Sequence, residues 1–289
     1  MNKVKAFEMR RKFMVVSLTG GYCELNCSHC GAKYIRSMLP APGPRLPALL
    51  AALHRRGVRG VLLSGGWTRD AVLPVEPYLD TLLEAKKRLG LVFNIHLGLE
   101  TRADILSRVG EFADIIDYEF TLSDWMVRGV RGLGFGPERY LEALDAMLDA
   151  GLNVVPHVFL WHPGSSEELL RREIDEIAER GIGVLNLLVY IPPRGDLPGG
   201  VAEKLPRLLD YVYSRFPGSL YLGCMRPRAA RRVLDPYAVG HDLVERIANP
   251  SIAVRRSYRD KLVFYDACCS IPEHYLPMFR VEEGSGRAT

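Results

Sequence analysis

Three cysteines, Cys23, Cys27 and Cys30, fall within the short stretch GGYCELNCSHCGAKY. Zinc and iron–sulfur clusters are the metal centres that thiolates select. A structural zinc site takes four protein ligands, so three thiolates leave one position open. His29 lies between the second and third cysteines and would strain to reach a metal that all three hold. We therefore expect a metal centre with an open position. A zinc site completed by His29 and a set of inert cysteines are the alternatives.

The remaining cysteines are Cys224, which stands alone, and the adjacent pair Cys268 and Cys269. A secreted disulfide scaffold would be shorter and richer in cysteine, so we expect a reduced, cytoplasmic protein. Three more thiolates could hold a second iron–sulfur cluster. The alternative is that Cys224 packs in the core and that the adjacent pair is incidental.

Short apolar, β-branched runs alternate along the chain with amphipathic stretches of helical period. Two helical stretches, 77–90 and 137–151, begin with proline and end with glycine, and a third, 165–181, begins with a capping box of Ser165 and Glu168. Such alternation builds parallel strands joined by helical crossovers, and seven or eight units suit a closed barrel. Strands are expected at 13–18, 60–64, 91–97, 114–120, 153–160, 184–191, 219–224 and 244–249.

The expected fold is a single α/β domain over residues 1–289, a (β/α)8 barrel. It has an N-terminal arm at 1–12 and a C-terminal extension at about 260–289 that folds over the barrel mouth. No low-complexity linker divides the chain. The first strand ends near Leu18, so the three clustered cysteines follow its carboxyl end, which is the face where such barrels build active sites.

Composition excludes several classes of protein. Apolar residues make up 48% of the chain and charged residues 25%, which is ordinary for a globular protein. No run of 18 or more apolar residues occurs, so we expect no membrane span, and the first residues lack the pattern of a signal peptide. The net charge is only +4 and the basic segments lie far apart, so we expect no nucleic-acid binding.

The Cys-x3-Cys-x2-Cys pattern on the first loop of a barrel resembles the radical S-adenosylmethionine superfamily. The resemblance implies that Cys23, Cys27 and Cys30 hold three irons of a [4Fe–4S] cluster and that S-adenosylmethionine chelates the fourth. One electron would then cleave the sulfonium and yield a radical that abstracts hydrogen from an unactivated C–H bond. An electron donor of the ferredoxin or flavodoxin type is also implied, because cluster potentials fall to about −700 mV.

Other residues match positions that bind the cofactor in this superfamily. Ser64, Gly65 and Gly66 resemble the Gly-Gly-Glu-like turn that binds the methionine amine, with Trp67 in place of the acidic residue. His29 matches the aromatic position near adenine. The resemblance further places Tyr190, Ile191 and Pro192 beside adenine, Glu100 and Glu119 near ribose or substrate, and Arg128 or Arg131 at the cofactor carboxylate, and leaves His157 as either a core histidine or a substrate contact.

Over most of its length the sequence resembles the biotin-synthase-like branch, in particular one component of two-part archaeal-type lipoyl synthases. The matching stretches are VVPHVFLWHPG, VYIPPRG, LGCMRPR, RIANPS and the final CCS. This implies sulfur insertion from an auxiliary cluster held by Cys224, Cys268 and Cys269, with a second synthase subunit and an acylated carrier protein as partners. Trp161 and His162 replace the small Gly-rich turn common in the branch. The alternatives are other radical chemistry, such as rearrangement, methylation or ring formation, and a metal-binding protein that only assembles with a partner.

Overall fold

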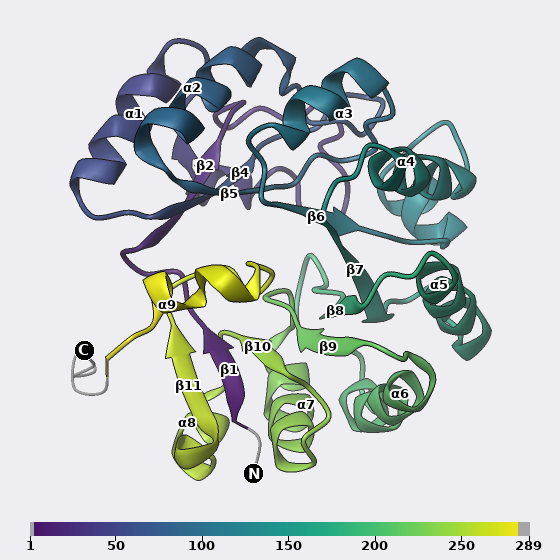
Figure 1. Ribbon diagram of the computed structural model, residues 1–289. Helices are drawn as coiled ribbons and strands as arrows, with labels where there is room; N and C mark the ends of the chain where they lie inside the picture. The colour runs from purple at the N-terminus through teal and green to yellow at the C-terminus, as the bar shows by residue number, and fades with distance from the viewer. Residues whose placement is uncertain (1–2, 283–289) are drawn as a thin grey trace.

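The structure, a computed structural model, describes residues 3–282. Across these residues eleven strands form one sheet in the order β11-β1-β10-β9-β8-β7-β6-β5-β4-β2-β3, and all pairings between them are parallel. Figure 1 shows that the sheet curls into a half-barrel, which confirms the expected α/β barrel architecture. The strands are β1 Val4–Phe7, β2 Phe13–Ser17, β3 Leu39–Pro40, β4 Gly60–Ser64, β5 Val92–Ile95, β6 Ile115–Glu119, β7 Val154–Trp161, β8 Val184–Val189, β9 Ser219–Leu222, β10 Arg246–Ala248 and β11 Leu262–Tyr265.

Helices lie on the outside of the curled sheet, with α1 to α4 in the upper part of Figure 1 and α5 to α8 on the right and below. Each turns an apolar stripe to the strands, because leucine, isoleucine and valine recur at helical spacing. The helices are α1 Arg45–Arg55, α2 Leu79–Leu89, α3 Ala103–Gly110, α4 Glu138–Asp149, α5 Glu167–Glu179, α6 Val201–Arg215, α7 Arg228–Gly240, α8 Ile252–Ser257 and α9 Leu276–Phe279, with single turns η1 Ile35–Ser37, η2 Glu76–Tyr78, η4 Arg259–Lys261 and η5 Glu273–Tyr275 and a π-helix η3 Trp125–Val130.

The predicted helix ends are confirmed in part. Gly90 adopts a left-handed conformation (φ 59°) directly after α2, as the C-terminal glycine signal indicates. At the start of α5 the predicted cap is wrong by one residue. The hydroxyl of Ser166, and not that of Ser165, accepts a hydrogen bond from the Leu169 N–H, while Ser165 donates to the His162 carbonyl. Either of the two adjacent serines can cap the helix, and the sequence alone does not distinguish them.

All eight predicted strands are present, as β2 and as β4 to β10. Beyond them, the expected N-terminal arm contributes β1 and the expected C-terminal extension contributes β11. β1 pairs with β10 and β11, and not with β2, so both ends of the chain complete one side of the sheet. The last seven residues of the predicted extension, 283–289, lie outside the described residues.

The segment after β11 does not fold over the barrel mouth, and that part of the prediction is wrong. Phe279 packs edge-on against Phe13, the first residue of β2, with ring centroids 5.7 Å apart. Tyr275 donates a 2.6 Å hydrogen bond to Asp114, directly before β6. The segment therefore closes the barrel at the amino ends of its strands, and Figure 1 shows α9 in yellow inside the curl, between β1 and β5. Burial of its apolar residues Leu276 and Phe279 against the strands drives this placement.

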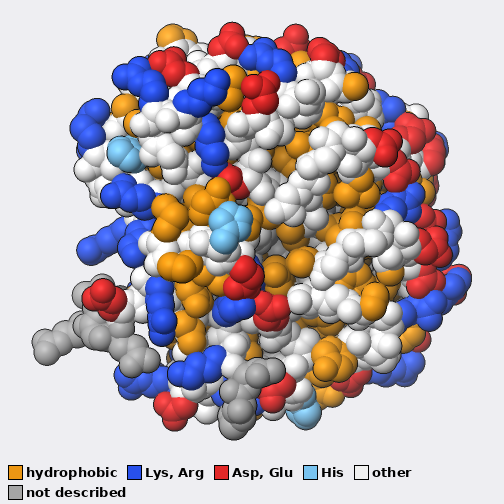
Figure 2. All heavy atoms as spheres, viewed as in Figure 1, with side chains coloured by type: hydrophobic (Ala, Val, Ile, Leu, Met, Phe, Trp, Pro, Cys, Tyr) orange, Lys and Arg blue, Asp and Glu red, His pale blue; other side chains and the backbone are white. Residues whose placement is uncertain are grey.

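None of the helices within residues 3–282 is long and apolar enough to cross a membrane. Figure 2 shows charged side chains around the rim of the molecule and hydrophobic ones gathered toward the middle of the same face, where α9 and its neighbours lie.

Candidate active site

Cys23, Cys27 and Cys30 lie on the long loop between β2 and η1, and each is half-buried. The loop makes a helical turn here, in which the Gly31 N–H donates to the Cys27 carbonyl at 2.9 Å. This turn brings the sulfur atoms of Cys27 and Cys30 to 3.8 Å from each other. The Ser28 N–H and hydroxyl both donate to the Val130 carbonyl, which ties the loop to the end of η3.

The turn after β4 supports the same loop. The Glu24 N–H donates to the Trp67 carbonyl at 3.0 Å, and the Cys23 thiol lies 3.9 Å from the same oxygen. A side chain on Gly66 would collide with the Tyr22 carbonyl and the Cys23 backbone, so only glycine allows this close approach. The Gly66 N–H itself donates to the Thr19 hydroxyl at 2.6 Å. The glycine turn therefore has a second task that its sequence did not reveal, which is to seat the cysteine loop.

A buried ion pair lies beneath the loop. Arg131, only 7% exposed, pairs with Glu119 at the end of β6, and its guanidinium lies 5.5 Å from the Trp67 ring centroid. One guanidinium nitrogen, Nη1, has no hydrogen-bond partner among the described residues. The hydrogen bond with Cys30, assisted by the Arg131 charge, lowers the pKa of the Cys27 thiol to about 6. The site thus favours a thiolate at Cys27.

The structure separates the two arginines that the sequence left open. Arg128 is largely exposed and pairs with Asp124 at 2.7 Å on the surface of η3, whereas Arg131 is buried beside the cysteine loop. Glu100 is held by hydrogen bonds to its neighbours in the chain. Its carboxylate accepts hydrogen bonds from the Thr101 and Arg102 N–H groups and from the Arg102 side chain, all at the start of α3. These local bonds account for Glu100 without a ligand, and its contact with ribose or substrate stays a prediction.

An aromatic cluster flanks the cysteines. The His29 ring lies 4.7 Å from Tyr190, Tyr190 lies 5.5 Å from Trp125, and Trp125 stacks on His162 at 5.4 Å. Both ring nitrogens of His29 and Nε2 of His162 are buried without hydrogen-bond partners in the described chain. Burial lowers the pKa of both histidines to about 4, so both rings are neutral at pH 7. Ile191 and Pro192 follow Tyr190 and are half-buried.

Sequence reasoning missed Trp125 as a site residue and noted His162 only as a departure from the branch. The signal that could have found them is the presence of aromatic side chains in the segments after two neighbouring strands, Trp125 after β6 and His162 after β7. Unpartnered buried nitrogens are rare in folded proteins, so His29, His162 and Arg131 together mark this cluster as a place where a ligand completes the hydrogen bonding.

An interior cavity of about 170 Å³ lies inside the barrel, below the cysteine loop. The second cysteine set is brought together here, since Cys224, Cys268 and Cys269 all line this cavity. Cys268 and Cys269 point to different strands: the Cys268 thiol lies 3.5 Å from Asp117 on β6, and the Cys269 sulfur lies 3.5 Å from the Asn186 amide on β8. Other cavity-lining residues are Trp67, His96, Glu119 and His157.

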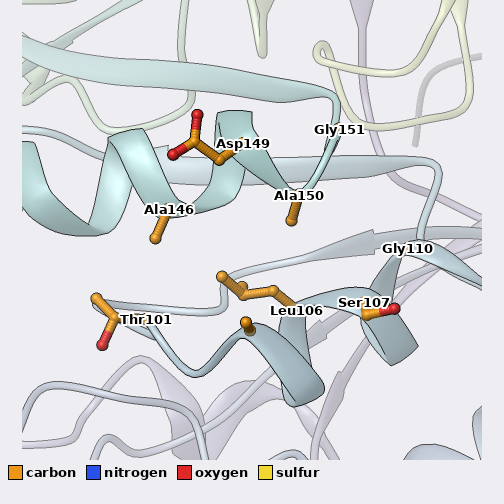
Figure 3. A pocket seen from close by; sticks show the side chains of 9 residues that line it. Thr101, Leu106, Ser107, Gly110, Ala146, Asp149, Ala150 and Gly151 are labelled. Carbon is orange, nitrogen blue, oxygen red and sulfur yellow. The ribbon is translucent and has the colours of Figure 1, made fainter.

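A second hollow lies on the outside of the barrel. Figure 3 shows it between α3 and α4, with Leu106 and Ser107 on one side and Ala146 and Asp149 on the other. Its volume is about 530 Å³, and its lining offers one carboxylate and small side chains but neither a thiol nor a histidine. The chemistry of the molecule therefore belongs to the barrel interior and the cysteine loop.

Within residues 3–282, no group of three or more His, Cys, Asp or Glu side chains is placed to hold a metal ion. A single ion draws its ligands close together, whereas an iron–sulfur cubane spreads its thiolate ligands over several iron atoms. The donor set suits the cubane better, because the loop offers three half-buried thiols, one with a lowered pKa, beside a buried cation.

Comparison with known proteins gives matches in fold but none in sequence. No protein-family model and no curated protein matches the sequence. SuiB of Streptococcus suis bound to S-adenosylmethionine aligns with 86% of this chain and 49% of its own, at 16% identity and a TM-score of 0.54. The FeFe-hydrogenase maturase HydG of Carboxydothermus hydrogenoformans aligns with 85% of this chain and 58% of its own, at 14% identity and a TM-score of 0.57. Methylornithine synthase (PylB) aligns with 86% of this chain and 72% of its own, at 13% identity and a TM-score of 0.54.

These neighbours are radical S-adenosylmethionine enzymes. At identities of 13–16%, the similarity shows that this chain shares their fold. The chain spans about half the length of the SuiB chain that it matches.

Proposed function

We propose that this protein is a radical S-adenosylmethionine enzyme in which Cys23, Cys27 and Cys30 hold a [4Fe–4S] cluster. The observation that carries the proposal is the cysteine loop: three half-buried thiols beside two buried groups with unpartnered nitrogens, Arg131 and His29. The support from the fold is that its structural neighbours are enzymes of this superfamily and that one of them was solved with S-adenosylmethionine bound.

When bound, the cluster and S-adenosylmethionine supply a strongly reducing electron and a radical that abstracts hydrogen from an unactivated C–H bond. The chain's own residues bind these groups and shield them from water. Arg131 supplies the positive charge that offsets the thiolates and is suited to pair with a carboxylate. His29, Tyr190, Trp125 and His162 form an aromatic wall for a flat ring, and the unpartnered nitrogens of the two histidines offer it hydrogen bonds.

Exclusion of water is the second task of these residues. Tyr190 is only 5% exposed and Trp67 lies between the cysteine loop and the interior cavity, in contact with both. A radical formed at this position is therefore confined between the aromatic cluster and the cavity, which is what protects a reactive intermediate from side reactions.

Sulfur insertion of the lipoyl-synthase kind is the finer form of the proposal. Its support is that Cys224, Cys268 and Cys269 line the cavity where a substrate would meet the radical. The partners of Cys268 and Cys269, which are Asp117 and the Asn186 amide, favour the second candidate, a radical enzyme of other chemistry in which these thiols are cavity-lining groups. Iron and acid-labile sulfide counts separate the candidates: about eight irons for two cubane clusters, about four for one, and zinc for a metal-binding assembly partner.

The partners belong to the proposal as well. A donor of the ferredoxin or flavodoxin type would supply the electron, and sulfur insertion would add a second synthase subunit and an acylated carrier protein. A reducing, cytoplasmic setting suits thiol ligands of this kind.

The direct test is anaerobic reconstitution with iron and sulfide, followed by dithionite and S-adenosylmethionine and measurement of 5′-deoxyadenosine. We expect the wild-type protein to form it, and Cys23→Ala, Cys27→Ala and Cys30→Ala each to abolish it with loss of iron. The matched control is Ser37→Ala at the end of η1, just beyond the cysteine loop, which should keep both the product and the iron. Undiminished product from any one cysteine variant would contradict the assignment.

A further inference from the structure

A buried carboxylate lines the interior cavity. Asp117, the third residue of β6, has a side chain only 2% exposed and lines the cavity. Its Oδ2 accepts a 2.8 Å hydrogen bond from the Asn94 amide and lies 3.5 Å from the Cys268 thiol. Its Oδ1 has no hydrogen-bond partner among the described residues. A carboxylate this deep in a protein costs free energy unless a positive group or further donors compensate it.

No lysine or arginine within residues 3–282 forms an ion pair with Asp117, and the basic side chains near it are two histidines, His96 and His157. His96 Nε2 lies 3.7 Å from Oδ2, too far for a good hydrogen bond, and its side chain is 38% exposed. Glu119, the next carboxylate on the same strand, is already paired with Arg131. Burial raises the pKa of Asp117, but His157, His96 and the Ser270 hydroxyl together lower it to about 2. Asp117 is therefore ionised although it has no lysine or arginine as its partner.

His157 does not supply that partner. Its Nδ1 lies 3.0 Å from the Val155 carbonyl, which only accepts, so Nδ1 carries the proton. Its Nε2 lies 2.6 Å from the Asn186 amide nitrogen, which donates, so Nε2 accepts. Both ring nitrogens are thereby used in the neutral form, and burial lowers the pKa of this histidine further. His157 faces Asp117 as an uncharged side chain.

We propose that this cavity binds a positively charged nitrogen group of the substrate, a primary ammonium in the simplest case, with Asp117 as its counter-ion. This inference rests on the proposed function and adds a substrate class to it. The unpartnered Oδ1 accepts one N–H of the ammonium. The positive charge of the ligand takes the place of a lysine or arginine partner for the carboxylate.

The position of Asp117 also orients the substrate. Asp117 and Glu119 are two residues apart on β6, so their side chains share the inner face and lie about 6–7 Å apart along the strand. Glu119 contacts Arg131 beneath the cysteine loop, whereas Asp117 lies deeper, beside Cys268. A substrate anchored at Asp117 by its ammonium therefore extends toward the cysteine loop and presents a carbon atom there, some distance from its charged end.

Binding can be measured without turnover. The probes are n-butylammonium, n-butanol and butanoate, titrated calorimetrically into the reconstituted protein with S-adenosylmethionine in an amine-free buffer. We expect n-butylammonium to bind the wild-type protein more tightly than the alcohol or the acid. Asp117→Asn should lower the affinity for n-butylammonium by roughly tenfold or more, because charge-assisted hydrogen bonds are about twice as strong as neutral ones.

The matched control is Glu173→Gln. Glu173 is also a buried carboxylate, 2% exposed, but it accepts hydrogen bonds from Thr121 and the Leu122 N–H on the outside of the barrel. The Glu173→Gln variant should therefore bind n-butylammonium with the same affinity as the wild-type protein. Should Asp117→Asn fail to fold, His96→Lys carries the test, since a lysine there brings its own ammonium to Asp117. That variant should unfold at a higher temperature and no longer bind the probe.

Three outcomes overturn the proposal. The first is equal affinity for n-butylammonium and n-butanol, or an ammonium affinity that Asp117→Asn leaves unchanged. The second is no ammonium binding together with a histidine NMR signal showing His157 cationic, which makes His157 the internal counter-ion. The third is binding of Zn²⁺ alone that depends on Asp117, which makes the cavity a metal site. Because 5′-deoxyadenosine is measured separately, loss of turnover with intact ammonium binding counts against the proposed function only.

Discussion

The three clustered cysteines and the adjacent pair Cys268 and Cys269 lie beside charges of opposite sign, at the two ends of the barrel interior. Cys23, Cys27 and Cys30 lie half-buried on a loop at the carboxyl ends of the strands, beside the positive charge of Arg131. Cys268 and Cys269 lie on the segment that closes the opposite end, next to the negative charge of Asp117. Within each pair of thiols the hydrogen bond between them lowers one pKa (Cys27, Cys269) and raises the other (Cys30, Cys268). The nearby charges differ, because Arg131 lowers the pKa of Cys27 whereas Asp117 raises the pKa of both Cys268 and Cys269.

The difference shows which cysteines are positioned by the neighbouring sequence and which by contacts between distant parts of the chain. The first group follows its strand directly, so the strand end fixes its position. Cys224 likewise follows β9, but Cys268 and Cys269 reach the cavity only because a segment more than 250 residues away in the chain from β2 packs against Phe13. We therefore expect changes in the C-terminal segment to alter the stability of the fold, and changes near the first loop to alter the metal site.

The largest expected effect is that of Phe279→Ala. Phe279 is fully buried against Phe13, and truncation of a buried phenylalanine costs about 3–5 kcal/mol of unfolding free energy. Denaturant unfolding of the metal-free protein measures this loss. The iron content of the first site should stay unchanged at temperatures where the variant is folded, because the cysteine loop lies at the other end of the barrel.

Met278→Ala is the matched control, since Met278 is 38% exposed on the same turn and should cost less than about 0.5 kcal/mol. Equal, small losses from both variants would mean that the segment is not anchored at the amino ends of the strands, and the comparison of the two ends would fail.

The sequence predicted the eight strands between β2 and β10 that alternate with helices, because each carries its own apolar run and its own flanking helix. It did not predict β1 and β11, since these strands lie near the two ends of the described chain and are held by pairing with each other, which no local pattern reveals. At the site, the spacing of Cys23, Cys27 and Cys30 identified the cysteine loop, whereas the choice of Arg131 over Arg128 depends on how η3 packs. The place of Asp117 was invisible for the same reason, because one carboxylate in an apolar strand gives no sign of its neighbours.

A smaller effect is expected from Gly66→Ala. A methyl group there collides with the backbone of Tyr22 and Cys23, so the cysteine loop must shift, at a cost of about 1–3 kcal/mol for overpacking. In contrast to Phe279→Ala, this variant should bind less iron after reconstitution. The control is Gly134→Ala, where a methyl group meets open space and neither stability nor iron content should change. Normal iron content in Gly66→Ala would show that the glycine turn does not position the thiols.

The last prediction compares the thiols themselves, through alkylation of the metal-free, folded protein by iodoacetamide between pH 5 and pH 9, with peptide mapping by mass spectrometry. The pKa of Cys27 is lowered to about 6 by its hydrogen bond with Cys30 and by Arg131, so Cys27 is a protonated, slow thiol below pH 6 and a reactive thiolate above it. The pKa of Cys268 is raised well above its ordinary value by its hydrogen bond with Cys269 and by burial, so Cys268 should stay unmodified up to pH 9 until the protein is unfolded. Arg131→Lys should keep the charge and the low midpoint of Cys27, and Arg131→Gln should raise that midpoint. A Cys27 midpoint near the ordinary cysteine value of about 8.5 would remove the electrostatic contrast between the two ends of the barrel.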